Sequence, residues 1–134
     1  MTNSKLISVM GASEAEALAG AGIYTTDQLL ARGASSAGRM RLADETHLAD
    51  AQIKEWVHLS DLLRLDGVSA SLAVLLAAAG VMTVPKLAYQ TSDALHAKLQ
   101  AVNQEKSYLK KLPTVAELET LIHSAKRAPK MVRH

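Results

Sequence analysis

Apolar residues in this chain recur at spacings of three and four, which is the period of an α-helix. In residues 50–63 one apolar stripe contains Ile53 and Trp56, and Leu59 and Leu62 add a second apolar face. A helix that is apolar on two sides is buried on both. We therefore expect this helix to be central and Trp56 to be a core anchor. No alternating run is long enough to predict a strand, so the pattern predicts an all-α fold.

One part of the pattern occurs twice. When Leu65–Ala88 is moved back by 58 positions it falls on Ile7–Leu30, and nine of the 24 aligned pairs are identical. The identical pairs are Ala12/Ala70, Ser13/Ser71, Ala15/Ala73, Leu18/Leu76, Ala19/Ala77, Ala21/Ala79, Gly22/Gly80, Thr25/Thr83 and Leu29/Leu87. An internal repeat indicates two similar modules. We expect one module in residues 1–64, which includes the long helix, and a second in residues 65–128, packed together as one compact domain, with a basic tail in residues 129–134.

Capping signals indicate where the helices begin and end. Three pairs have the spacing of a capping box: Ser13 with Glu16, Thr25 with Gln28, and Thr114 with Glu117. The residues expected to cap other helices are Ser35, Asp50 and Ser92, and those expected to end helices are Gly22, Gly33 and Gly80. The expected helices cover 12–21, 26–33, 36–47, 50–63, the repeat of the first two within 65–88, then 92–102, 103–112 and 114–128. Lys130–His134 is expected to be loose.

Composition narrows the class of protein. The chain has no cysteine, which excludes disulfides and thiolate chemistry, and only 3% aromatic residues, which favours a core of small aliphatic side chains. The most hydrophobic run, Leu72–Ala79, is eight residues long, whereas a membrane span needs about 20. The first ten residues lack the layout of a signal peptide. We therefore expect a cytoplasmic protein that does not enter a membrane.

Charge is distributed unevenly along the chain. Residues 98–134 hold eight Lys and Arg against three Glu, whereas residues 1–97 hold seven against ten Asp and Glu. A basic C-terminal part suits an acidic partner such as nucleic acid, although a modest excess of this kind is also typical of a solvated surface.

No catalytic or metal-binding pattern is present. The five histidines are His47, His58, His96, His123 and His134, which form no i, i+4 pair and lack a flanking ligand cluster. The glycines follow no predicted strand, so they do not form a dinucleotide-binding loop. We expect a non-enzyme without metal or cofactor.

The repeated stretch resembles the helix-hairpin-helix motif, in which a Gly-aliphatic-Gly hairpin precedes an alanine-rich helix. The matching hairpin positions are Val9-Met10-Gly11 and Gly67-Val68-Ser69. The trailing elements, Ala21 to Thr25 and Ala79 to Thr83, resemble those of the C-terminal domain of the RNA polymerase alpha subunit. From about Ile7 to Ala128 the chain is most similar to an uncharacterised bacterial family of tandem helix-hairpin-helix proteins, catalogued as a domain of unknown function.

The resemblance implies binding of a DNA phosphate by the hairpin N–H groups and the following helix N-terminus. This sequence departs from the motif at the positions that matter. Val9 and Ser69 stand where the motif has glycine, and Ser69 can cap its own helix. The lysine often found in the second helix is Ser13 in one copy and Ser71 in the other. Neither Ile7–Gly22 nor Leu65–Gly80 contains Lys or Arg, so we expect both hairpins to be poor phosphate sites.

Two hypotheses for the function follow. The first is a binder of duplex nucleic acid that holds the backbone without reading bases. The second is a protein-interaction or scaffold module whose hairpins no longer bind DNA. The candidate contact residues for the first are Met10, Gly11, Ala12, Ser13, Gly67, Val68, Ser69, Ala70, Arg39, Arg41, Arg64, Lys110, Lys111, Lys126, Arg127, Lys130 and Arg133.

Overall fold

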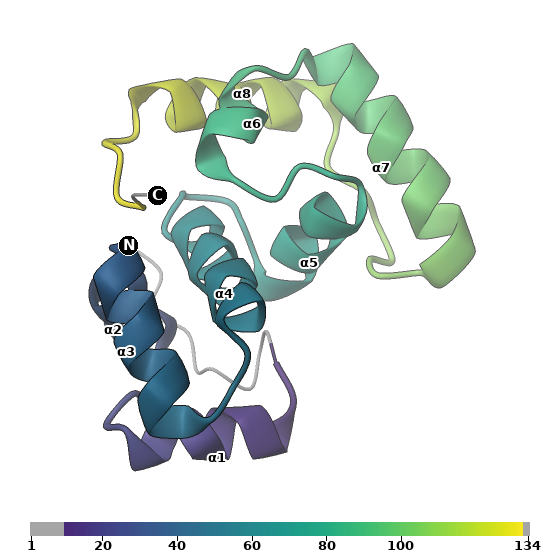
Figure 1. Cartoon of the computed structure of the whole chain (residues 1–134). Helices are drawn as coiled ribbons and strands as arrows, with labels where there is room; N and C mark the ends of the chain where they lie inside the picture. Colours follow the sequence, from purple (N-terminus) through teal and green to yellow (C-terminus); the bar gives the residue numbers. More distant parts are fainter. Residues whose placement is uncertain (1–9, 133–134) are drawn as a thin grey trace.

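The computed structural model describes residues 10–132, and in this range the chain forms eight α-helices and no β-strand (Figure 1). The helices are α1 (Ala12–Gly20), α2 (Thr26–Gly33), α3 (Ser36–Thr46), α4 (Asp50–Leu63), α5 (Ala70–Ala78), α6 (Val84–Ala88), α7 (Ser92–Lys106) and α8 (Val115–Arg127). The predicted all-α fold is confirmed. Among the described residues, no helix combines the length and the hydrophobicity that crossing a membrane requires.

The sequence repeat reappears as a repeat of backbone geometry at the ends of α1 and α5. The two helices have nine residues each, and their bounds differ by 58 positions. Each is followed by a left-handed glycine, Gly22 with φ +85° and Gly80 with φ +87°. The residue after this glycine donates its N–H to the carbonyl of a buried leucine, Leu18 at 3.0 Å and Leu76 at 2.8 Å. This pattern is a Schellman stop, which requires glycine at the left-handed position.

The start of the next helix is also the same in both copies. The Thr25 hydroxyl accepts a hydrogen bond from the Gln28 N–H at 3.3 Å, and the Thr83 hydroxyl accepts one from the Lys86 N–H at 3.1 Å. In the first copy the Gln28 side chain returns a bond to the Thr25 N–H, which completes the predicted capping box. In the second copy Pro85 lies in the first turn, where its missing N–H costs nothing.

The same order of packing occurs in α1–α4, the first unit, and α5–α8, the second unit. Helix α2 packs on α4 as α6 packs on α8, and α3 packs on α4 as α7 packs on α8. Both α3 and α7 end at a left-handed non-glycine residue, His47 with φ +61° and Ser107 with φ +51°. Helix α4 also contacts α5 and α6, so it lies between the two units (Figure 1).

A single hydrophobic core runs through both units. On α4 the buried side chains lie on more than one face and include Ile53, Trp56, Leu59 and Leu62, as the two apolar stripes predict. Trp56 is 5% exposed, which agrees with its expected place in the core. Helix α8 buries a single stripe and leaves its outer face polar. The second apolar face of α4 suits its position between the two units.

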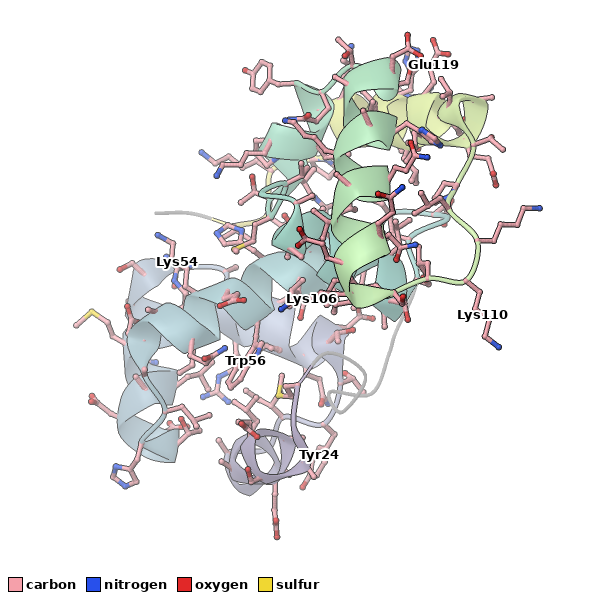
Figure 2. The ribbon with its side chains drawn as sticks, turned by 90° about the vertical axis from the view of Figure 1, so that its right-hand side faces the viewer. Tyr24, Lys54, Trp56, Lys106, Lys110 and Glu119 are labelled. Carbon is pink, nitrogen blue, oxygen red and sulfur yellow. The ribbon has the colours of Figure 1, made fainter. Side chains whose placement is uncertain are left out.

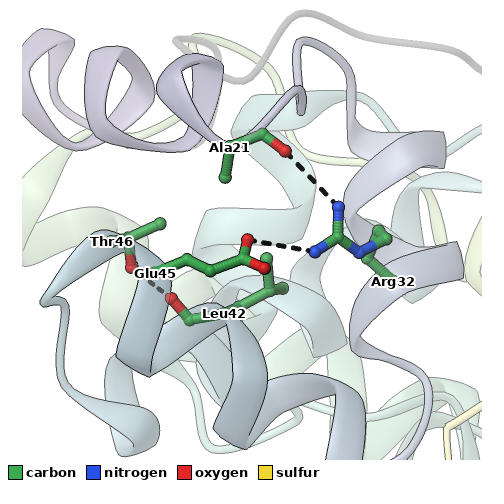
Figure 3. A network of polar contacts seen from close by, with 5 residues as sticks. All are labelled: Ala21, Arg32, Leu42, Glu45 and Thr46. Atoms are coloured by element: carbon green, nitrogen blue, oxygen red, sulfur yellow. Dashed lines mark hydrogen bonds and ion pairs between the residues drawn. The ribbon is translucent and has the colours of Figure 1, made fainter.

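A polar network ties the first three helices together (Figure 3). The Arg32 guanidinium donates to the carbonyl of Ala21 at 3.4 Å and pairs with the Glu45 carboxylate at 3.2 Å. The Thr46 hydroxyl donates to the Leu42 carbonyl at 2.6 Å, one turn back in α3. These contacts connect the end of α1 to α2 and α3. Because both partners of the ion pair are about 40% exposed, the pair itself contributes little.

Three of the expected helix caps are wrong. Gly11 is the N-cap of α1, and Ser13 lies inside the helix, where its hydroxyl donates to Glu14. Asp50 and Ser92 are the first residues of α4 and α7, and the N-cap positions belong to the residues before them. In each case the polar residue lies one or two positions beyond the cap position, so its side chain does not reach the free N–H groups.

The expected helix over 103–112 is also wrong. Helix α7 continues to Lys106, and Ser107 then turns the chain into a loop over residues 107–114. The Asn103 side chain holds this loop, because its amide donates to the Leu109 carbonyl and accepts from the Leu109 N–H, both at 2.9 Å. A side-chain amide that pairs with a backbone in this way competes with continuation of the helix.

The C-terminal segment is not loose as far as the structure describes it. Pro129 offers its carbonyl to Arg64 at 2.6 Å, and Val132 is 6% exposed and belongs to the core. We call residues 129–132 the strap. The rest of the expected loose tail, residues 133–134, lies outside the described residues.

Candidate functional site

The second hairpin, Gly67-Val68-Ser69, lies between α4 and α5. Val68 is buried, whereas Gly67 and Ser69 are exposed. Gly67 has φ +88°, and a Cβ at this position would lie 3.3 Å from the Cδ2 of Leu121. This position therefore favours glycine both for its backbone angle and for its space. The turn presents the N-terminus of α5 to solvent, which is the geometry that binds anions.

Ser69 reduces the capacity of that helix N-terminus. Its hydroxyl accepts a hydrogen bond from the N–H of Leu72 at 3.2 Å, as expected for a serine at the N-cap. One of the donors that a phosphate would use is therefore already satisfied.

A groove of about 450 Å³ runs beside this hairpin, and we call it the hairpin groove. Its walls are the hairpin, the loop over residues 107–114 and the first half of α8. The lining residues are Asp66, Gly67, Ser69, Leu72, Leu109, Lys111, Leu112, Pro113, Glu117, Thr120 and Leu121. The groove thus brings together three of the candidate residues, Gly67, Ser69 and Lys111, from segments that are distant in the sequence.

Lys111 brings a cation to the second hairpin, although the hairpin segment itself contains no Lys or Arg. Lys111 is exposed and reaches the groove from the loop that Asn103 holds. Lys110, the next residue in this loop, is also exposed and points away from the helices into solvent (Figure 2). Lys111 therefore lies beside the hairpin, and Lys110 adds a second exposed cation on the same loop.

Two carboxylates lie in the same groove and oppose this charge. Asp66 precedes the hairpin and is exposed, and Glu117 belongs to the predicted capping box of α8, which the structure confirms. The Thr114 N–H donates to Glu117 at 2.9 Å, and this hydrogen bond lowers the pKa of the Glu117 carboxyl. Glu117 is therefore ionised at neutral pH, and the hairpin groove carries both signs of charge.

The first hairpin differs from the second. Gly11 has φ −71°, outside the left-handed region. A Cβ placed on Gly11 would lie 2.5 Å from a carboxylate oxygen of Glu14, so that carboxylate lies directly against the hairpin. Met10 is half-buried against the core, whereas Ala12 and Ser13 are exposed. An anion approaching α1 would meet a carboxylate, which disfavours phosphate binding. Val9 lies outside the described residues.

Two of the candidate arginines are engaged inside the protein. Arg39 is 3% exposed and donates to the carbonyls of Gly33 and Ala34 at 2.8 and 3.3 Å. It therefore holds the end of α2 and is not accessible to a phosphate, which corrects its place among the contact residues. Arg64 pairs with Asp61 and donates to the strap. Arg41 is exposed.

The Asp61–Arg64 pair lies in the interior near the end of α4. Only 4% of the Asp61 side chain and 11% of the Arg64 side chain are exposed. Burial raises the pKa of the Asp61 carboxyl, and the hydrogen bond and the charge of Arg64 partly oppose this rise. Removal of either partner would leave a buried group without its counter-charge, which is costly.

The remaining candidate cations lie at the end of α8. Lys126, Arg127 and Lys130 are exposed around the last turn of this helix and the start of the strap. Arg133 lies outside the described residues. The candidate residues therefore divide into the hairpin groove with its loop and a basic end of α8.

No cluster of three or more metal-ligating side chains occurs within residues 10–132.

The sequence alone did not reveal the second wall of the hairpin groove. Leu109, Leu112 and Pro113 were not candidates, because the segment that contains them was expected to be a regular helix. The useful signal was the asparagine at 103, a residue type that often bonds to a nearby backbone and interrupts a helix.

Comparison with known proteins decides the family. Residues 8–128 match the family described as Domain of unknown function (DUF4332). The chain belongs to this family. The match to DUF4332 covers all eight helices and ends at the C-cap of α8, so the strap lies beyond it. No curated protein and no solved structure matches the chain. The function of this DUF4332 domain must therefore be argued from its own geometry.

Proposed function

We propose that this chain is a non-enzymatic, cytoplasmic helix-hairpin-helix module that binds duplex nucleic acid through the phosphate backbone, without base specificity. The second hairpin is the contact, and Lys110 and Lys111 supply the charge. One observation carries the proposal: Lys111 lines the same groove as Gly67 and Ser69, although it is more than 40 positions away in the sequence. A helix N-terminus with an adjacent lysine is a recurrent way to hold a phosphate.

The repeated geometry supports the helix-hairpin-helix part of this proposal. The alanine-rich helix, the glycine stop and the threonine cap recur in the same order in both copies, and this supports the resemblance of the repeated stretch to the motif. In this proposal the two copies have diverged. The first copy has a structural role, because Glu14 lies against its hairpin, and the second copy makes the phosphate contact.

Binding is expected to be weak and strongly dependent on salt. Ser69 already satisfies one N–H of α5, and Asp66 and Glu117 add negative charge to the groove. Each phosphate neutralised by a lysine adds about 0.9 to the slope of log K against log salt. Two lysines at this site therefore contribute about two to the magnitude of that slope.

The test is fluorescence anisotropy of a short labelled duplex, titrated with the protein between about 50 and 200 mM salt. We expect micromolar binding at low salt that weakens as salt rises. The double variant Lys110→Ala/Lys111→Ala should bind more weakly and lose about two units of slope. Sequence changes in the duplex should alter the affinity little, since backbone contacts do not read bases.

A matched control removes the same charge elsewhere. Lys54→Ala/Lys86→Ala replaces two lysines that do not line the hairpin groove, and it should leave the slope almost unchanged. A third variant, Lys126→Ala/Arg127→Ala/Lys130→Ala, tests the end of α8 without removing the strap. Absence of binding at low salt, or equal losses in the first variant and the control, would contradict the proposal.

The alternative is a protein-interaction or scaffold module. The contact between Glu14 and the first hairpin and the Ser69 cap on the second favour it, because both occupy positions that a phosphate would use. This alternative predicts no binding of the duplex at any salt concentration.

A further inference from the structure

A second and larger groove lies on another side of the molecule. It has a volume of about 780 Å³ and is bounded by α4, α6, the end of α8 and the strap, and we call it the strap groove. Met82, Val84, Met131 and Val132 are among its apolar lining. Methionine side chains adapt to the shape of different apolar partners. None of these residues belongs to the hairpin groove, so the two sites are separate.

The strap forms one side of this groove. Residues 129–132 follow α8 without helical structure and turn toward the end of α4 (Figure 1). The Arg64 guanidinium donates to the Pro129 carbonyl at 2.6 Å, and the Val132 side chain is buried in the core. One backbone hydrogen bond and one buried apolar side chain therefore fix the strap as a wall of the groove.

The rim of the strap groove is positively charged. Lys54 from α4, Lys86 from α6 and Lys130 from the strap all line it, and Figure 2 shows the Lys54 side chain at the surface of α4. Among residues 10–132, the ion pairs are Arg32–Glu45 and Arg64–Asp61, so these three ammonium groups have no carboxylate partner there.

The charges on this lining do not cancel. Asp61 is neutralised by Arg64, and Glu55 is the remaining carboxylate on the lining. Three lysines against one glutamate leave the groove with a net positive charge. Such a rim attracts and orients an acidic partner.

We propose that the strap groove binds a short segment of a partner protein that combines acidic with apolar side chains. The apolar residues of the segment contact Met82, Val84 and Met131, and its carboxylates face Lys54, Lys86 and Lys130. This interaction goes beyond the proposed binding of nucleic acid and uses different residues.

A random-peptide display library, selected on the full chain, tests the chemistry of the partner. We expect the enriched peptides to combine Asp or Glu with Leu, Ile or Met. Their affinity should fall at least about tenfold in the charge-reversed variant Lys54→Glu/Lys86→Glu/Lys130→Glu. The control Lys98→Glu reverses an exposed lysine outside the strap groove and should retain full affinity. Enriched peptides without acidic residues, or equal binding to the triple variant, would overturn the proposal.

The methionine methyl groups locate the bound peptide. In NMR spectra of the full chain with labelled methionine methyls, an enriched peptide should shift the signals of Met82 and Met131. Met40, which is 60% exposed on α3, is an internal control whose signal should not move. Shifts at Met40 without shifts at Met82 would overturn the assignment of the site. The proposal would also fail if the library yielded no enriched peptide while a simple fatty acid shifted the signals of Met82 and Met131. Duplex binding is measured separately, so either proposal can fail alone.

Discussion

Replacement of Trp56 by alanine tests the packing of the core around the central helix α4. Trp56 is 5% exposed and lies on α4, the helix that contacts both units. A buried aromatic side chain removes roughly 150–250 Å² from water, which at about 25 cal/mol per Å² is worth roughly 4–6 kcal/mol as an upper bound. Measured losses for such substitutions are about 3–5 kcal/mol. We expect Trp56→Ala to lower the free energy of unfolding by this amount.

A loss of this size is large for a domain of 134 residues. Domains are stable by about 5–15 kcal/mol in total, and each kilocalorie moves the melting temperature of a chain of this length by roughly 3–5 °C. The melting temperature should therefore fall by about 10–20 °C. Because one core runs through both units, unfolding should remain a single transition in the wild-type chain.

The assay is urea and thermal denaturation followed by far-UV circular dichroism, since the variant lacks the only tryptophan. Trp56→Phe is the matched control, because it keeps most of the apolar volume, and it should lose clearly less stability than Trp56→Ala. A loss below about 1 kcal/mol for Trp56→Ala would refute the role of this residue as a core anchor.

Three further predictions concern single side chains. Gly80→Ala should lower the free energy of unfolding by about 1–2 kcal/mol, because alanine disfavours the left-handed backbone angle. Gly67→Ala should lower it more, because the new Cβ would lie 3.3 Å from Leu121, whereas nothing lies within 4 Å at Gly80. Equal losses of stability in urea denaturation would contradict this. Folding lowers the pKa of the Glu117 carboxyl below its usual value of 4.5. The ionised carboxylate therefore stabilises the fold at pH values above 4.5, and this stabilisation is lost as the pH falls through the pKa of the folded state. The melting temperature of the wild type should exceed that of Glu117→Gln at neutral pH, and the difference should close in acid; a difference independent of pH would count against this cap. Arg39→Met should lower the free energy of unfolding by about 1.5–3 kcal/mol, because it removes charged hydrogen bonds to the end of α2. Arg41→Met is the control and should change it by less than about 0.5 kcal/mol. A larger loss for Arg41→Met than for Arg39→Met would contradict the assignment of Arg39 to the interior.

Local signals in the sequence predicted most of the fold. The period of three and four in the apolar residues gave the helices, and the two faces of α4 predicted its central place. Gly22 and Gly80 were expected to end helices, and both adopt the left-handed angle that such a stop requires. These features depend on contacts between residues close in the chain, which a sequence pattern records directly.

The errors arose where a polar side chain had several possible partners. Ser13, Asp50 and Ser92 were expected to cap helices, but each lies inside one. Asn103 bonds to the backbone of Leu109 and stops α7, although the residues after it have a composition that suits a helix. The choice between such hydrogen bonds is made by tertiary packing, which local spacing does not encode.

The candidate site could be predicted only in part, because long-range contacts assemble it. The sequence identified Gly67 and Ser69, but it did not place Lys111 beside them or Glu14 against Gly11. It also treated Arg39 as a surface cation, whereas packing of α2 against α3 buries it. Charge counted along the segment therefore missed Lys111 and Glu117 at the second hairpin, because both come from other parts of the fold.

The central claim is that the second hairpin, and not the first, holds a phosphate. The most direct measurement is an NMR titration of backbone amides with a short duplex at low salt. The account predicts shifts at the amides of Gly67–Leu72 and at Lys110 and Lys111, with those of Gly11–Glu14 unmoved. Shifts centred on Gly11–Glu14, shifts confined to the end of α8, or no shifts at all would contradict it.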